Sequence, residues 1–109
     1  MAESTLTLAT RLNMQLSGLL TALDIDLIGR ETSKIIARIR QLSLDMRLDV
    51  RDWEMAENRV EMSENAETGL ERLEELRKQI LRASEHGIFT SVDVVHLSAQ
   101  IDSIVADLK

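Results

Sequence analysis

The side chains best suited to metal chemistry in this 109-residue chain are Asp93 and His96, which are three residues apart. On a helix, a pair at this spacing lies on one face, and a carboxylate and an imidazole so placed form part of the ligand set of helical di-metal bundles. Such sites use glutamate and need further carboxylates inside an apolar stripe, which this sequence does not supply. His86 stands beside Gly87, where a cation would favour a helix C-terminus. We therefore expect neither a metal nor a cofactor.

A second candidate site consists of four glutamates at steps of three and four residues: Glu54, Glu57, Glu61 and Glu64. On one continuous helix they would make an acidic row, which could imitate the phosphates of a nucleic acid and dock on a basic partner. A row of this kind is more often a solvated helix face. An acidic inhibitor or nucleic-acid mimic is therefore an alternative function and not our main prediction.

A short basic patch of Lys34, Arg38 and Arg40 suggests another alternative, a small helical DNA-binding regulator. Acidic residues are interleaved from Asp45 onward, and no compact turn between short helices is evident. The formal net charge of −6 also opposes binding to a phosphate backbone. Nucleic-acid binding is therefore only weakly supported.

Motifs of catalysis and of targeting are missing from the sequence. There is no cysteine, no G-x-S-x-G motif and no glycine-rich phosphate loop. The first residues, MAESTLTLATRL, lack the basic start of a signal peptide, and polar residues interrupt the apolar positions that follow. We expect a cytoplasmic protein that is not an enzyme and does not span a membrane.

The elements that position these residues are expected to be helices, because the composition favours them. Hydrophobic residues make up 44% of the chain, aromatic residues only 2%, and proline is absent. An aliphatic core suits helix packing better than sheet packing, since strands favour aromatic and β-branched residues. A chain of this length forms one domain, so we expect one all-α domain over residues 1–109.

Apolar side chains recur at three- and four-residue steps in four segments. The predicted helices span about 5–27, 33–61, 68–85 and 91–108. Thr68 and Glu71 form a capping box that would start the third helix, yet helical spacing continues through the polar stretch 61–69. One continuous helix over 33–85 is therefore a nearly even alternative.

Residues 42–50 alternate strictly between apolar and polar types, which is the pattern of a half-buried strand. The stretch is nevertheless rich in leucine, methionine and arginine, which favour helices, and only Val50 is β-branched. No second strand is visible as a partner. A helix is the better interpretation.

The boundary between the last two predicted helices is the clearest in the chain. Gly87 fits the residue after a helix C-cap, and Ile88 can add the apolar contact of a Schellman motif. Thr90, with Asp93 three residues on, predicts the N-cap of the next helix. Phe89 lies between the two signals, where we expect it to plug the connection.

The predicted helix at 33–61 is apolar on two opposite sides, so it needs cover on both, from its own chain or from a second one. The last predicted helix carries an apolar seam with coiled-coil spacing, which must pack on the bundle or on a partner. Trp53 is a candidate interface anchor or plain core. The candidate interface residues are Leu44, Leu48, Trp53, Met55, Val94, Leu97, Ile101, Ile104 and Leu108.

These patterns predict an all-α fold, either a three- to four-helix antiparallel bundle or a long helical hairpin, completed by dimerisation. The predicted function is a non-catalytic protein–protein interaction module, such as an adaptor, chaperone or regulatory subunit. We expect this module to act as a homodimer and to bind another protein.

Overall fold

Four helices make up the protein in a computed structural model, which describes residues 4–23 and 29–109. They are α1 (Thr5–Thr21), α2 (Arg30–Glu54), α3 (Arg59–Glu85) and α4 (Ser91–Leu108). No strand occurs within the two described ranges, so the all-α prediction is confirmed there and residues 42–50 are helical.

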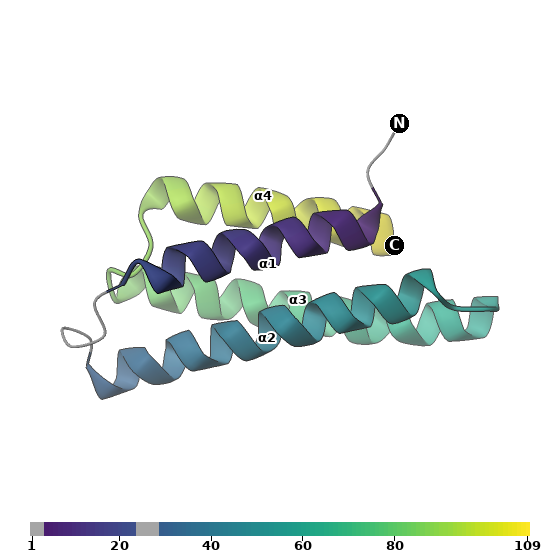
Figure 1. Ribbon diagram of the computed structural model, residues 1–109, viewed down its shortest axis with the longest axis horizontal. Coiled ribbons are helices and arrows are strands. Elements are labelled where there is room, and N and C mark those ends of the chain that lie inside the picture. The colour runs from purple at the N-terminus through teal and green to yellow at the C-terminus, as the bar shows by residue number, and fades with distance from the viewer. Residues whose placement is uncertain (1–3, 24–28) are drawn as a thin grey trace.

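The helices form a bundle in which each successive helix reverses direction (Figure 1). α2 packs against α1 and α3, and α4 packs against α3 and α1, so the four helices surround one core. α2 and α3, with 25 and 27 residues, are longer than α1 and α4, with 17 and 18. The α2–α3 hairpin therefore extends beyond the start of α1 and the end of α4 (Figure 1).

The core is aliphatic, as the composition predicts. Each helix contributes a stripe of buried side chains, represented by Leu12 of α1, Ile39 of α2, Leu76 of α3 and Ile101 of α4, none of which is more than 1% exposed. The apolar seam of α4 belongs to this core. The sequence allowed this seam to pack either on the chain's own bundle or on a partner. In the structure it packs on the bundle.

The ends of the first two helices differ from the prediction. α1 ends at Thr21 with Ala22 as its C-cap, whereas we expected a helix over 5–27. Residues 24–27 of that prediction lie outside the described residues. Gly29 is the N-cap of α2, which begins at Arg30 and not near 33.

The break between α2 and α3 lies at 55–58, which corrects both the predicted turn at 61–69 and the alternative of one helix over 33–85. Asn58 caps α3, since its side-chain oxygen accepts from the Glu61 N–H at 2.9 Å. The Glu61 carboxylate in turn accepts from the Glu57 N–H at 3.0 Å. This reciprocal arrangement resembles a capping box and fixes where the second long helix begins.

The capping box predicted at Thr68 is wrong, because that residue lies inside α3. Its hydroxyl donates to the carbonyl oxygen of Glu64, one turn earlier, at 3.2 Å. A threonine hydroxyl in a helix interior commonly donates to the carbonyl oxygen one turn earlier. Thr68 therefore bonds within α3 and does not cap the start of a helix.

The connection between α3 and α4 is confirmed in detail. Gly87 has a φ of 77°, its N–H donates to the Ser84 carbonyl at 3.0 Å, and the Ile88 N–H donates to the Ala83 carbonyl at 3.0 Å. These two bonds define a Schellman motif. Thr90 and Asp93 form the expected capping box at the start of α4. Phe89 between them is 4% exposed.

Two glycine-to-alanine substitutions should have opposite effects on the free energy of unfolding. Gly87→Ala forces a side chain into left-handed backbone, which costs about 1–2 kcal/mol. Gly18→Ala should stabilise by roughly 0.5–1 kcal/mol, because Gly18 lies within α1 and nothing is within 4 Å of an added Cβ. Urea denaturation at one protein concentration measures both, and a stable Gly87→Ala variant would contradict the assigned turn.

Candidate interaction surface

An uncovered apolar stripe follows the outer side of α2 through Leu44 and Leu48 and includes Met55, the C-cap residue of the helix. Their side chains are 49%, 45% and 71% exposed. The opposite side of the same helix is buried, as Ile39 and Met46 are both 0% exposed. The bundle therefore covers one of the two apolar sides of α2 and leaves the other open. We call these three exposed residues the α2 ridge.

Charged side chains border the α2 ridge on both of its flanks. Arg40 lines a depression of about 140 Å³ together with residues of α1, whereas Asp45 accepts from Arg72 of α3 at 2.9 Å. Seven residues make about two helical turns, so Arg47 lies on the same flank as Arg40, and Asp52 on the same flank as Asp45. Arg38 and Glu54 follow the same spacing, so the flank toward α1 carries Arg40, Arg47 and Glu54, and the flank toward α3 carries Arg38, Asp45 and Asp52.

An ionic network fixes α2 against α3 behind the flank toward α3. Arg72 of α3 lies between Asp45 and Asp49, with its Nε 2.6 Å from the Asp49 Oδ2. Burial raises the pKa of the Asp49 carboxyl above its ordinary value, although the charge and hydrogen bond of Arg72 act in the opposite direction. Glu75 and Arg38 add a longer ionic contact at 4.0 Å. The ridge is thus held on a firmly packed helix.

Polar contacts also fix α1 against α2. The Asn13 side-chain amide donates to the Ser43 hydroxyl at 2.8 Å, and Ser43 is 2% exposed. At the other end, the Glu54 carboxylate accepts from the Leu6 N–H at 2.8 Å. A carboxylate at this place satisfies a free N–H group in the first turn of α1.

The four glutamates predicted as an acidic row do not lie along one helix. Glu54 ends α2, Glu57 lies in the connection, and Glu61 and Glu64 belong to α3. Glu54 and Glu61 are also engaged with backbone N–H groups. The assumption of one continuous helix, on which the row depended, is therefore wrong.

The short basic patch is divided as well. Arg38 faces α3, where it contacts Glu75, and Lys34, one turn earlier, lies on the same side. Arg40 faces α1. The three cations therefore do not present one surface to a nucleic acid.

The α4 residues of the predicted interface lie inside the bundle. Leu97, Ile101, Ile104 and Leu108 are 0% to 6% exposed, and Val94 is partly buried against the same core. The chain itself covers these residues, which leaves the α2 ridge as the exposed part of the predicted interface.

Trp53 is partly buried against the core and lines an open groove of about 480 Å³ near the end of the α2–α3 hairpin. Met62, Leu70 and Leu108 share the groove with it. Trp53 thus packs partly on the core and lines a surface groove, while its role as an interface anchor stays a prediction.

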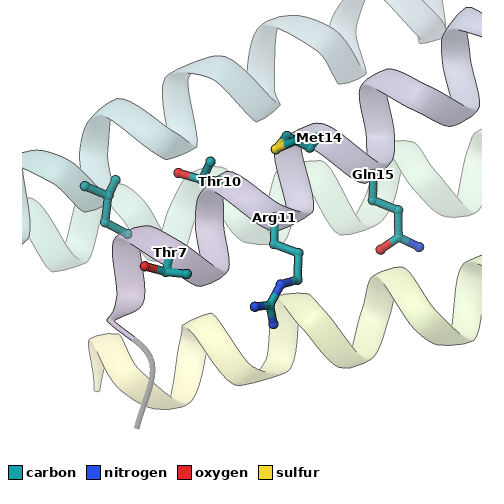
Figure 2. A pocket seen from close by; sticks show the side chains of 6 residues that line it. Thr7, Thr10, Arg11, Met14 and Gln15 are labelled. Carbon is teal, nitrogen blue, oxygen red and sulfur yellow. The ribbon is translucent and has the colours of Figure 1, made fainter. Parts of the chain in front are cut away.

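A larger open depression of about 750 Å³ follows the outer face of α1. Figure 2 shows that Arg11 and Gln15 extend toward α4, while Met14 points away from it. Gln15 pairs with Gln100 of α4, and Met14 is 68% exposed. All the lining side chains come from one helix, so the depression has no opposing wall and adds Met14 to the exposed apolar surface.

Of the two residues considered for metal binding, Asp93 has a structural role. The Asp93 carboxylate accepts from the Thr90 N–H at 3.1 Å, and His96 is exposed. Across residues 4–23 and 29–109, no three histidine, aspartate or glutamate side chains come together as metal ligands would. Within the same ranges, no helix combines the length and hydropathy that crossing a bilayer requires.

Several exposed apolar residues were missed at the level of sequence, namely Met14, Val60, Leu81, Val92 and Val95. Met14, Val60 and Leu81 each stand outside a helical stripe, and Val92 and Val95 form only one pair at a three-residue step, so periodicity gives little warning of them. The charge pattern beside the α2 ridge was readable, since Arg40, Arg47, Asp45 and Asp52 repeat at seven-residue steps. Comparisons with family models, with curated proteins and with solved structures found no match to this chain.

Proposed function

We propose that this protein is a non-catalytic helical interaction module, an adaptor, chaperone or regulatory subunit, that works as a homodimer. The observation that carries the proposal is the α2 ridge, where Leu44, Leu48 and Met55 remain about half exposed or more in the folded chain. Contiguous exposed apolar side chains bordered by charges are typical of protein-binding surfaces.

The expected association is weak. Covering a half-exposed leucine or methionine contributes roughly 1 kcal/mol, so six such side chains in a symmetric pair contribute roughly 6 kcal/mol. This gain alone corresponds to a dissociation constant of about 40 μM, and the loss of translational and rotational freedom offsets much of it. We therefore expect a dissociation constant in the millimolar range, and association must be measured up to a few millimolar.

The proposal is tested by measuring the oligomeric state of a variant that carries two added charges on the α2 ridge. The double substitution Leu44→Asp with Leu48→Asp should abolish dimers across the concentration range, because it places two carboxylates in the apolar contact. Circular dichroism should show unchanged helicity, since both side chains already face solvent. Sedimentation equilibrium and light scattering give the mass.

Leu81→Asp is the matched control, because Leu81 is 49% exposed, as is Leu44. It follows Arg77 by one turn, and Arg77 pairs with Asp102 of α4, so Leu81 faces the α3–α4 side. This variant should dimerise as the unmodified protein does. An unmodified protein that stays monomeric at a few millimolar would refute the proposal.

A further inference from the structure

The groove beside Trp53 lies at the end of the core, where the α2–α3 hairpin extends beyond α1 and α4 (Figure 1). Along α3, the exposed fraction of the core-facing side chains rises toward this end, from 0% at Leu73 to 8% at Ala66 and 37% at Met62. Along α2, Val50 is 0% exposed, whereas Trp53, one turn later, is only partly buried. The last layer of the core is therefore open. We call this space of about 480 Å³ the hairpin groove, and its apolar lining includes Trp53, Met62, Leu70 and Leu108.

Negative charge collects around the hairpin groove. The groove is lined from two segments, 53–70 and 107–109, and these contain six acidic and two basic residues, a net charge of −4. Widening the first segment to 51–72 leaves that value unchanged, because Arg51 offsets Asp52 and Glu71 offsets Arg72. The acidic residues are Glu54, Glu57, Glu61, Glu64, Glu67 and Asp107, and the basic residues are Arg59 and Lys109. Most of the chain's net charge of −6 therefore lies at this end.

From these two features we infer that the hairpin groove binds a basic amphipathic segment of another protein, one that carries lysine or arginine beside a few aliphatic side chains. The inference rests on the proposed interaction module and names the chemistry of its partner. The aliphatic side chains would cover Trp53 and Met62, and the groove volume lies within the range of sites that enclose a small ligand. The basic side chains would meet the surrounding carboxylates, since complementary charge speeds association and selects the partner.

The same charge argues against other occupants of the groove. Two copies that met through their hairpin grooves would bring two regions of net charge −4 together, and like charges across an interface cost free energy. A nucleic acid would be repelled for the same reason, because its backbone carries a negative charge at every phosphate. A basic protein segment is the occupant that the charge favours.

Trp53 supplies the reporter for a binding test, because it is the only tryptophan in the chain and it lines the groove. The probe is a synthetic helical peptide without aromatic residues, with leucines along one side and lysines elsewhere. In about 50 mM salt it should change the Trp53 emission to saturation, with a dissociation constant of roughly 100 μM. In about 500 mM salt the binding should weaken about tenfold, because salt screens exposed charges.

Two control peptides separate the ionic contribution from the apolar one. In the first, glutamates replace the lysines, which keeps the leucines and reverses the charge. In the second, serines replace the leucines, which keeps the charge and removes the apolar side. Each should bind about tenfold more weakly than the probe. Equal binding of the glutamate peptide would overturn the basic partner, and equal binding of the serine peptide would overturn the apolar groove as its site.

Substitutions in the protein locate the site. Glu67→Lys should weaken binding of the probe about fivefold. Glu85→Lys makes the same change at an exposed position about 27 Å further along α3 and should leave binding unchanged. Met62→Ser should also weaken binding about fivefold, through loss of apolar contact, whereas Met14→Ser, at a side chain of α1 that is 68% exposed, should not. Equal effects within either pair would contradict the assigned groove.

The outcomes separate this inference from the proposed homodimer. At about 10 μM protein, a dimer with a millimolar dissociation constant is not populated, so the titration measures the monomer. An unchanged Trp53 emission up to about 1 mM probe would overturn the basic partner and leave self-association through the α2 ridge standing. Saturable binding by a protein that stays monomeric would support the groove and refute the homodimer alone. If Trp53 emission shifted when the Leu44→Asp, Leu48→Asp variant was concentrated by itself, a second copy would occupy the groove and the inference would be overturned.

Discussion

Leu76→Ala should lower the free energy of unfolding by about 3 kcal/mol, within the range of roughly 2–5 kcal/mol seen for buried leucines. Leu76 is 0% exposed and lies in the middle of α3, the helix that packs against both α2 and α4. Removing its side chain leaves a cavity that the surrounding aliphatic side chains fill only in part, so contacts are lost as well as apolar burial.

Leu81→Ala makes the same chemical change on the same helix at a position that is 49% exposed. It should cost less than about 1 kcal/mol. Urea denaturation must be done at one protein concentration, because dimerisation would add to the apparent stability. Equal losses in the two variants would contradict the placement of Leu76 in the core.

Arg72→Met should destabilise the protein in a pH-dependent manner, by about 1–2 kcal/mol at pH 7 after allowance for the solvent that reaches Arg72. Arg72 Nη1 lies 2.9 Å from Asp45 Oδ2, and its Nε lies 2.6 Å from Asp49 Oδ2. Without the guanidinium, two neighbouring carboxylates at the α2–α3 contact lose their shared partner.

The sign of the pH dependence follows from Asp49. Burial raises the pKa of its carboxyl, while Arg72 opposes that rise, so removal of Arg72 raises the pKa further. A group whose pKa is raised by folding adds stability below its unfolded pKa, and that contribution is lost as the pH rises through the folded pKa. The difference between Arg72→Met and the unmodified protein should therefore grow from about pH 4 toward pH 7.

Asp49→Asn provides the control for this effect. When Arg72→Met is combined with Asp49→Asn, the loss of the guanidinium should cost less at pH 7 and depend less on pH, because one of the two carboxylates is gone. Thermal or urea unfolding at several pH values measures the four proteins, namely the unmodified chain, the two single variants and the double variant. A loss that is constant from pH 4 to pH 7 would show that Arg72 acts through packing of its stem and not through charge.

Local rules were sufficient for much of this fold. The α3–α4 connection follows from Gly87 and Thr90, since left-handed backbone and a side-chain cap depend on one residue and its nearest neighbours. The helical state of residues 42–50 was also correctly favoured over a strand, because leucine, methionine and arginine are good helix formers. The α2 ridge was recognisable from the spacing of Leu44, Leu48 and Met55 alone.

The break between α2 and α3 was misplaced because two local signals compete and only packing separates them. Asn58 followed by Glu61 is the signal that caps α3, whereas Thr68 followed by Glu71 offered a second one. Gly69 lies beside the second signal but within α3, where close approach of the neighbouring helices explains the absence of a side chain. A Cβ added there would lie 3.3 Å from Leu108 Cδ1 of α4 and 3.8 Å from Asp49 Cβ of α2.

The amino-acid sequence by itself therefore determined the helical class, the aliphatic core type and the caps at 87–93, because these depend on contacts within a few residues. Only the tertiary structure decided which apolar stripe is covered. The α4 seam of Leu97, Ile101 and Ile104 is buried within the bundle, while Leu44 and Leu48 remain open. Both stripes have the same periodicity, and what separates them is the number of helices that one chain can place around α2.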